Sequence, residues 1–388
     1  MLTLIRNASI YDPEPRGALD VLVAGAKIAA VGEKLDIRGE LLDVIDADGG
    51  ILLPGIVDVL THPSGGGGEG GFGNRTSAVG FEAFRDAGIT CPVGALGTDS
   101  IGRSLDVLFA DVMALRDKGI DAHMLTGAYR LPAPTITGDV ARDIAFIAPV
   151  IGIGELAISD HRSSQPTAEE LRRIAADARL GGTLSGKRGV VLVHVGDADS
   201  GLAPLREALE DSALPVHSYY PTHVNRRREL LDEAVAFARD GGYIDITVST
   251  TPELLKLGEV AARVALKDAI AAGAPADRIS LSSDAGGSLP VFHDGEFAGL
   301  SSAGPDVLLE LVYDAFAHEP DFAPTVIAAL TRNPADAMGL AHKGRIAAGA
   351  DADILIIDPD QQALSHVLCR GRRLQGHQRL SNATKGGH

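Results

Sequence analysis

The sequence is poor in cysteine and in aromatic side chains. Its 388 residues include two cysteines, no tryptophan and 4% aromatic residues. Cys91 and Cys369 cannot form a disulfide framework, and neither belongs to a CxxC zinc pattern. Basic charge is scarce as well, because 35 Lys and Arg face 52 Asp and Glu, for a net charge of −17. This balance argues against nucleic acid or an anionic membrane as the main partner, since both are polyanions.

Long hydrophobic runs are also missing. The first residues, MLTLIRNASIYDPEPRG, are typical of a strand and a turn, so they predict neither a signal peptide nor a membrane helix. We therefore expect a cytoplasmic protein. Glycine, in contrast, is abundant, with 46 residues against a hydrophobic content of 45%. This combination favours tight strand-to-helix connections over disorder.

Both ends of the chain have the alternating pattern of β-strands. Residues 1–53 contain three strand-like runs separated by turn signals, and GRIAAGADADILIID and HVLCRGRRLQG repeat the pattern near the C-terminus. We expect one small β-sandwich domain built from residues 1–53 and 344–380. Two separate capping hairpins are the alternative.

The middle of the chain, residues 54–343, alternates apolar strands with amphipathic helices, several of which end in glycine. This alternation predicts a (β/α)₈ TIM barrel within the α/β class. A doubly wound sheet is the alternative, but no GxGxxG motif or Walker loop opens a helix. The eight predicted strands are 55–62, 90–97, 121–129, 150–159, 189–196, 214–223, 242–249 and 278–284.

Five of these strands finish on a residue type that binds metals or transfers protons. In a TIM barrel, the carboxyl ends of the strands converge on one face, where catalytic residues gather. Any one of these residues alone is more often a core or loop residue, but five at the same structural position indicate a site. Imidazoles and carboxylates together suit Zn²⁺ or a similar divalent ion. The five residues are His62, Glu155, His194, His223 and Asp284.

Candidate substrate-binding residues lie close to these strand ends. The glycine run at 64–71 is either a flexible loop or a backbone that passes close to a ligand, with Glu69 available for an ammonium group. Arg162 and Arg226 either capture a carboxylate or are solvated charges. Tyr129 either polarises a carbonyl or packs.

Several motifs resemble a known family. The LPGIVD segment before the first barrel strand and the GRIAAGADADILIID segment after the barrel resemble the amidohydrolase superfamily. GGGGEGG, GTDSIGR, MLTGAYRLPAPTITG, AISDHRS and LSSDAGGS are similar to its isoaspartyl (β-aspartyl) dipeptidase branch, and the resemblance covers nearly the whole chain. It implies homo-oligomers and a small acidic amino acid or dipeptide as substrate.

The resemblance also implies residue roles. The loop with Gly67, Gly68 and Glu69, together with Thr98, would bind the free α-amino group of the substrate, and Tyr129 would polarise the scissile carbonyl. The remaining implied roles are substrate carboxylate binding by Arg162, Arg226 and Ser288, metal binding by His194 and His223, and both metal binding and general base catalysis by Asp284.

Two positions depart from the family pattern. The superfamily has His-x-His after the first barrel strand, where this chain has Leu60-Thr61-His62, and the family's carboxylated lysine is replaced by Glu155 with one extra residue nearby. A catalytic zinc needs about three protein ligands. We therefore expect one well-held divalent metal, most simply Zn²⁺, at Glu155, His194 and His223, and a second metal that is weakly bound or absent.

These features predict a metal-dependent hydrolase that cleaves the amide of a β-aspartyl dipeptide or a similar acidic amino-acid derivative. Two alternatives remain open at this point. One is a deaminase or lyase that acts on an aspartate-like amino acid in the same pocket. The other is a non-catalytic descendant that binds an acidic amino acid without metal.

Overall fold

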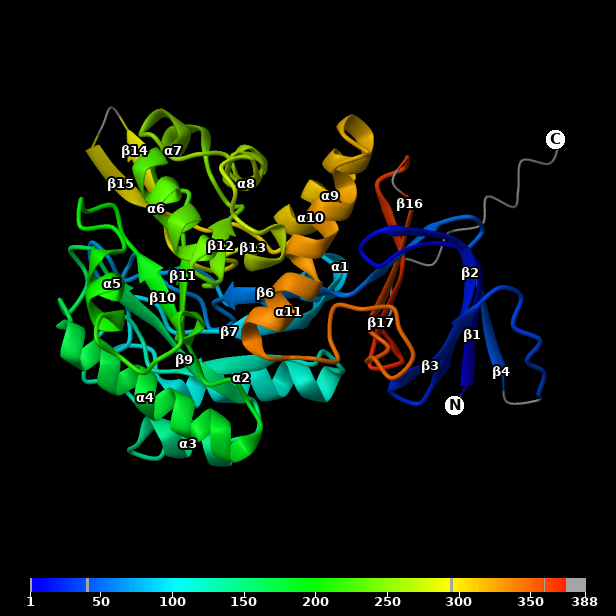
Figure 1. The fold of residues 1–388 in the computed structure, drawn as a ribbon, viewed down its shortest axis with the longest axis horizontal. Coiled ribbons are helices and arrows are strands. Elements are labelled where there is room, and N and C mark those ends of the chain that lie inside the picture. Colours follow the sequence, from blue (N-terminus) through cyan, green and yellow to red (C-terminus); the bar gives the residue numbers. More distant parts are fainter. Residues whose placement is uncertain (1, 40–41, 294–295, 359, 375–388) are drawn as a thin grey trace.

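The computed structural model describes residues 2–39, 42–293, 296–358 and 360–374. Residues 375–380, the end of the predicted β domain, lie outside the described residues. Figure 1 shows two neighbouring parts, a larger one of strands and helices and a smaller one made of strands from both ends of the chain.

The larger part is the predicted barrel. Its first six strands form one parallel sheet in chain order, and the last two form a parallel pair. The chain after β13 returns to β6, where the His62 N–H donates to the Ala285 carbonyl at 2.7 Å. The (β/α)₈ class is confirmed, and the sequential strand order excludes the doubly wound alternative. The strands are β6 (Ile56–Thr61), β7 (Ile89–Gly94), β8 (His123–Thr126), β9 (Val150–Ile158), β10 (Val190–Val195), β11 (Tyr219–Thr222), β12 (Ile244–Thr247) and β13 (Ile279–Ser282).

The helices lie between and after these strands and begin where the sequence offers caps. Thr167 and Glu170 form a capping box at the start of α4, and Gly186 ends that helix in the left-handed conformation. Within the described ranges, no helix is both long and apolar enough to span a membrane. The α-helices are α1 (Phe81–Asp86), α2 (Leu105–Lys118), α3 (Val140–Phe146), α4 (Ala168–Ser185), α5 (Ala203–Leu209), α6 (Arg228–Arg239), α7 (Pro252–Lys256), α8 (Ala262–Ala271), α9 (Val307–His318), α10 (Ala323–Leu330) and α11 (Arg332–Met338).

Both chain ends enter one eight-stranded sheet. Its order is β18-β17-β16-β5-β1-β2-β3, with β4 paired to β1. Antiparallel pairing of β5 with β16 joins the two ends, so the alternative of two separate hairpins is wrong. The strands are β1 (Leu2–Tyr11), β2 (Pro15–Ala24), β3 (Lys27–Gly32), β4 (Leu42–Asp46), β5 (Ile51–Pro54), β16 (Ile354–Asp358), β17 (Ala363–Cys369) and β18 (Arg372–Leu374).

A buried lysine ties this sheet to the barrel. The Lys343 ammonium lies 2.7 Å from Asp121 Oδ2, which precedes β8, and 2.7 Å from Asp353 Oδ2, which precedes β16. Asp351 Oδ2 completes the group at 3.0 Å. Because the group is buried, removing the Lys343 ammonium would leave the three carboxylates without a compensating charge.

One element was not anticipated from the sequence. A hairpin of β14 (Leu289–His293) and β15 (Glu296–Ser301) follows β13 and projects from the barrel on the same side as α7 (Figure 1). It begins directly after Ser288, one of the residues that the family resemblance assigns to the substrate.

Asp58 on β6 is a buried carboxylate of the barrel interior. Burial raises its pKa to about 7, although hydrogen bonds from the N–H and hydroxyl of Ser283 act in the opposite direction. A pKa that is higher in the folded than in the unfolded chain gives stability at low pH that is lost as the pH rises. The relevant window runs from about pH 4 to about pH 7.

Asp58→Asn is therefore expected to become more stable relative to the wild type as the pH rises through this window. The free energy of unfolding of the variant should gain roughly 1 kcal/mol per pH unit over that of the wild type. Urea unfolding at pH 5, 6, 7 and 8 measures the difference. A constant difference across these pH values would mean that Asp58 titrates alike in both states.

Candidate functional site

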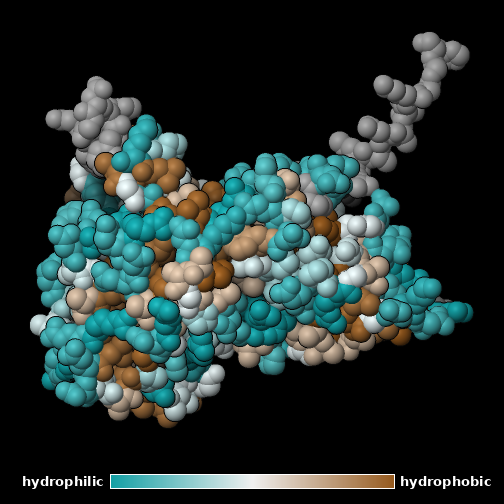
Figure 2. All heavy atoms as spheres, turned by 45° about the horizontal axis from the view of Figure 1, so that its top comes forward, coloured by the Kyte–Doolittle hydropathy of each residue, from teal (hydrophilic) through white to brown (hydrophobic). Residues whose placement is uncertain are grey.

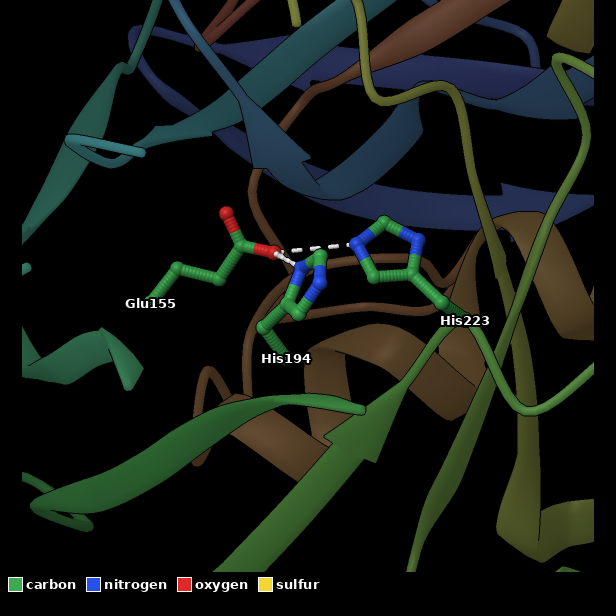
Figure 3. A group of neighbouring side chains, drawn as sticks. All are labelled: Glu155, His194 and His223. Carbon is green, nitrogen blue, oxygen red and sulfur yellow. Dashed lines mark hydrogen bonds and ion pairs between the residues drawn. The ribbon is translucent and has the colours of Figure 1, made fainter. Parts of the chain in front are cut away.

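Glu155, His194 and His223 form a buried group with the geometry of a metal site. Glu155 Oε1 lies 2.7 Å from His194 Nδ1 and 2.9 Å from His223 Nε2. One ligand atom from each residue lies within 4.8 Å of the others. Figure 3 shows the carboxylate directed at both rings. The charges and hydrogen bonds of the two imidazoles hold the pKa of Glu155 well below its usual range, although burial favours the opposite shift.

The hydrogen-bond partner of the second nitrogen in each ring indicates that this group can bind a cation. His194 Nε2 lies 3.0 Å from Asp160 Oδ2, and His223 Nδ1 lies 2.6 Å from Thr247 Oγ1. A carboxylate only accepts, so His194 donates from Nε2, and the Thr247 hydroxyl can accept from His223 in the same way. In that tautomer the nitrogens that face Glu155 can offer lone pairs to a metal ion, in place of the hydrogen bonds that they otherwise donate to the carboxylate. Lone pairs of nitrogen and oxygen directed at one point suit a divalent metal with oriented histidine ligands.

A β-bulge places Glu155 in this group. Ile153 pairs with Val191 and Leu156 with Val193, so two residues of β9 oppose one residue of β10. The prediction that Glu155 ends its strand is therefore wrong, because it lies inside β9. The extra residue noticed in the sequence is absorbed by the bulge, which turns the Glu155 side chain toward the histidines.

A second pair lies on the other side of Glu155. His62 Nε2 is 3.0 Å from Asp284 Oδ1 and 3.6 Å from Glu155 Oε2. His62 Nδ1 lies 3.0 Å from the Ala95 carbonyl, which can only accept. Burial lowers the pKa of His62, but the hydrogen bond and charge of Asp284 outweigh it and raise the pKa to about 9. Leu60 is completely buried in an apolar cluster and offers no ligand.

Asp160 connects the metal-like group to the arginine beside it. In addition to His194, it accepts from Arg162 Nε at 2.9 Å and from Arg162 Nη2 at 2.7 Å, in a bidentate pair. Sequence reasoning missed Asp160, although it lies within the AISDHRS motif. Its position two residues before Arg162, just after β9, was the available signal.

Arg162 in turn reaches Glu69. Arg162 Nη1 donates to Glu69 Oε1 at 2.9 Å, and the hydroxyls of Thr98 and Ser288 donate to the same oxygen at 3.1 and 3.0 Å. Burial raises the pKa of Glu69, but a backbone hydrogen bond and the charge of Arg162 outweigh it, and the net shift is downward. Glu69 Oε2 is buried and has no hydrogen-bond partner among the described residues. Thr98 and Ser288 thus orient Glu69.

Tyr129 packs against His194, and Arg226 follows His223 by three positions. The Tyr129 hydroxyl is 2.7 Å from His194 Nδ1, and burial raises its pKa well above the usual value. Arg226 Nε is buried and finds no hydrogen-bond partner within the described part of the chain. Arg162 is thus engaged by carboxylates of the protein, while the Arg226 guanidinium retains a buried unused donor.

A cavity of about 400 Å³ is lined by six of the predicted site residues. Glu69, Arg162, Arg226, His223, Asp284 and Ser288 line it. Sequence reasoning missed seven polar residues of its wall: Asp160, His161, Asp197, Asn225, Thr247, Ser249 and Glu259.

Gly67 and Gly68 determine the backbone conformation of the glycine loop. Both have positive φ, 92° and 104°, and a Cβ on Gly67 would lie 2.7 Å from the Asn74 carbonyl oxygen. A larger residue would therefore push the two arms of the loop apart. From this loop, Glu69 and Gly70 reach the cavity wall.

Comparison with known proteins agrees with this architecture. The model of the amidohydrolase family matches residues 158–378. The chain belongs to the amidohydrolase family. It is similar to a solved β-aspartyl dipeptidase from Fervidobacterium islandicum AW-1, crystallised with the dipeptide β-Asp-Leu, with 39% identity and a TM-score of 0.89 over 97% of this chain and 96% of that chain.

More distant amidohydrolases also match. A dihydroorotase from Lactiplantibacillus plantarum is 24% identical over 93% of this chain and 90% of its own length. A dihydroorotase from Streptomyces coelicolor is 47% identical, but over 16% of this chain and 13% of its own length. The similarity to the dipeptidase therefore extends over the whole described fold, whereas that to the second dihydroorotase is confined to a short segment.

Proposed function

We propose that this amidohydrolase is a metal-dependent dipeptidase that hydrolyses β-aspartyl dipeptides. The observation that carries the proposal is the cavity, whose wall combines the acidic Glu69, the cationic Arg226 and His223, one member of the group formed with Glu155 and His194. The solved relative that was crystallised with β-Asp-Leu supports the same substrate class. A cytoplasmic location and assembly into homo-oligomers remain predictions.

The cavity offers complementary groups for both charges of a β-aspartyl residue. The unpaired Glu69 Oε2 would accept the α-ammonium group, with Thr98, Ser288 and Arg162 fixing the carboxylate from its other oxygen. Arg226 would bind the substrate carboxylate through its buried unused Nε donor. Arg162 would act mainly by holding Glu69, because two nitrogens of the Arg162 guanidinium already donate to Asp160.

Glu155, His194 and His223 would hold the metal, which we propose to be Zn²⁺. When bound, a zinc ion supplies Lewis-acid polarisation of an amide carbonyl and lowers the pKa of a water molecule toward ~7. The pair of His62 and Asp284 offers fewer ligands, which supports one well-held ion and a weak or absent second.

Two residues would handle charge and protons during the reaction. The Tyr129 hydroxyl would donate a hydrogen bond to the carbonyl oxygen of the scissile amide as negative charge develops on it. Asp284, which faces the cavity, would take a proton from the attacking water and deliver it to the leaving amine. The products are aspartate and a free amino acid.

Metal content and product analysis test the proposal together. Elemental analysis of protein purified without chelators is expected to give about one zinc per chain, and incubation with β-Asp-Leu is expected to release equal amounts of aspartate and leucine. Ammonia without leucine would instead indicate a deaminase or lyase. Binding of aspartate with neither metal nor product would indicate a non-catalytic binding protein and would overturn the proposal.

A further inference from the structure

The cavity wall has a charged part and an apolar part. The charged residues described above lie along the barrel strand ends and the glycine loop. Another part of the wall is apolar and comes from two elements, helix α7 and the hairpin β14–β15 (Figure 1). In Figure 2, hydrophobic surface gathers next to the place where this hairpin projects. The apolar lining residues are Leu254, Leu289, Pro290 and Leu300.

These leucines are only half-buried. A cavity that combines a few fixed polar groups with an apolar wall is typical of small-molecule sites, in which the apolar part adds affinity and the polar part fixes orientation. The wall therefore has apolar surface available to a bound molecule, whose burial would be favourable.

The segment after α7 adds a carboxylate to the cavity wall. Glu259 follows α7, lines the same cavity and accepts a hydrogen bond from the Thr250 hydroxyl. Its charge interacts with those of Arg226 and Asp284. A side-chain carboxylate on the leaving residue that came near Glu259 would be repelled by its negative charge.

We propose that Leu254, Leu289 and Leu300, with Glu259, form the subsite for the side chain of the leaving amino acid, and that this subsite selects apolar over acidic residues. The inference rests on the proposed function. The β-aspartyl half of every substrate is the same and requires the charged groups Glu69 and Arg226. The leaving residue is the variable half, and the apolar residues form the part of the wall that suits an apolar side chain.

Substitution of the apolar part and of the acidic part of the subsite should change the preference for different leaving residues. Truncating Leu254 removes apolar surface that a leucine side chain would contact and a glycine would not. A few methylene groups in a pocket change specificity about tenfold. Neutralising Glu259 removes repulsion that affects a leaving glutamate and not a leaving glutamine, which has nearly the same shape.

The test compares kcat/KM for four dipeptides, β-Asp-Leu, β-Asp-Gly, β-Asp-Gln and β-Asp-Glu, in the zinc-loaded full chain. Leu254→Ala is expected to lower the Leu/Gly ratio about tenfold. Glu259→Gln is expected to raise the Glu/Gln ratio about fivefold or more. Matched controls come from α7 itself: Leu255→Ala and Glu253→Gln alter exposed side chains outside the cavity wall and should change neither ratio.

Binding of the same dipeptides to chelator-treated protein, measured by calorimetry, separates this inference from the proposed function. Unchanged ratios in Leu254→Ala and Glu259→Gln, with active protein, would overturn the subsite and leave the dipeptidase in place. Absence of turnover, with Leu254-dependent preference for β-Asp-Leu in binding, would overturn the dipeptidase and support the subsite. Absence of both would overturn both.

Discussion

Asp284→Asn is expected to lower kcat for β-Asp-Leu hydrolysis by about 10³-fold, within the range that general acid–base catalysis contributes. The amide has the size of the carboxylate and can still contact His62, which lies 3.0 Å from Asp284 Oδ1, but it cannot take a proton from water. The loss should therefore appear in kcat and much less in KM. Initial rates over a range of β-Asp-Leu concentrations, at matched zinc content, measure it.

Asp197→Asn is the control for this substitution. Asp197 lines the same cavity but is exposed, and its amide variant should retain the wild-type kcat. If kcat falls by less than tenfold in Asp284→Asn, Asp284 is not the general base. Another proton acceptor in the cavity would then have to take that role.

Glu155→Gln is expected to lose both metal and activity. The carboxylate is the negative member of the group, 2.7 Å from His194 Nδ1 and 2.9 Å from His223 Nε2, and a neutral amide binds Zn²⁺ far less well. Since loss of an outer-shell partner already weakens metal binding about 10–100-fold, loss of a ligand should exceed 100-fold. Competition with a zinc-binding dye measures the affinity.

Asp58→Asn is the matched control, because it also converts a buried barrel carboxylate to an amide while the three-residue group stays intact. It should bind zinc like the wild type. Wild-type zinc affinity in Glu155→Gln would show that the ion is held elsewhere, and the mechanism built on this group would be wrong.

The ends of the barrel strands could be predicted because the alternation of apolar strands with amphipathic helices is visible in the sequence. Runs of β-branched residues followed by a polar residue specify both a buried strand and the residue at its mouth, and His62, His194, His223 and Asp284 were located in this way. For Glu155 the sequence predicts its place beside the two histidines but not its local structure, because it lies inside β9. A bulge depends on how two strands pair, and the sequence of one strand does not contain that information.

Other features could not be predicted because they arise from contacts between distant segments. Asp160 is significant only because His194, 34 positions later, lies against it. Glu259 and the hairpin β14–β15 belong to the cavity through tertiary packing and carry no motif. The sequence also gave no means to distinguish Arg162 from Arg226, since the difference lies in which guanidinium already has carboxylate partners.

The shared sheet has a consequence for the order in which the protein is made. Strand β5 pairs with β16, which is translated roughly 300 residues later. At a ribosomal rate of about 5–20 residues per second, the β5 edge remains open for tens of seconds after it emerges. An open strand edge is a template for pairing with other chains. The N-terminal strands of this protein therefore have to be kept from other nascent chains until the last strands emerge.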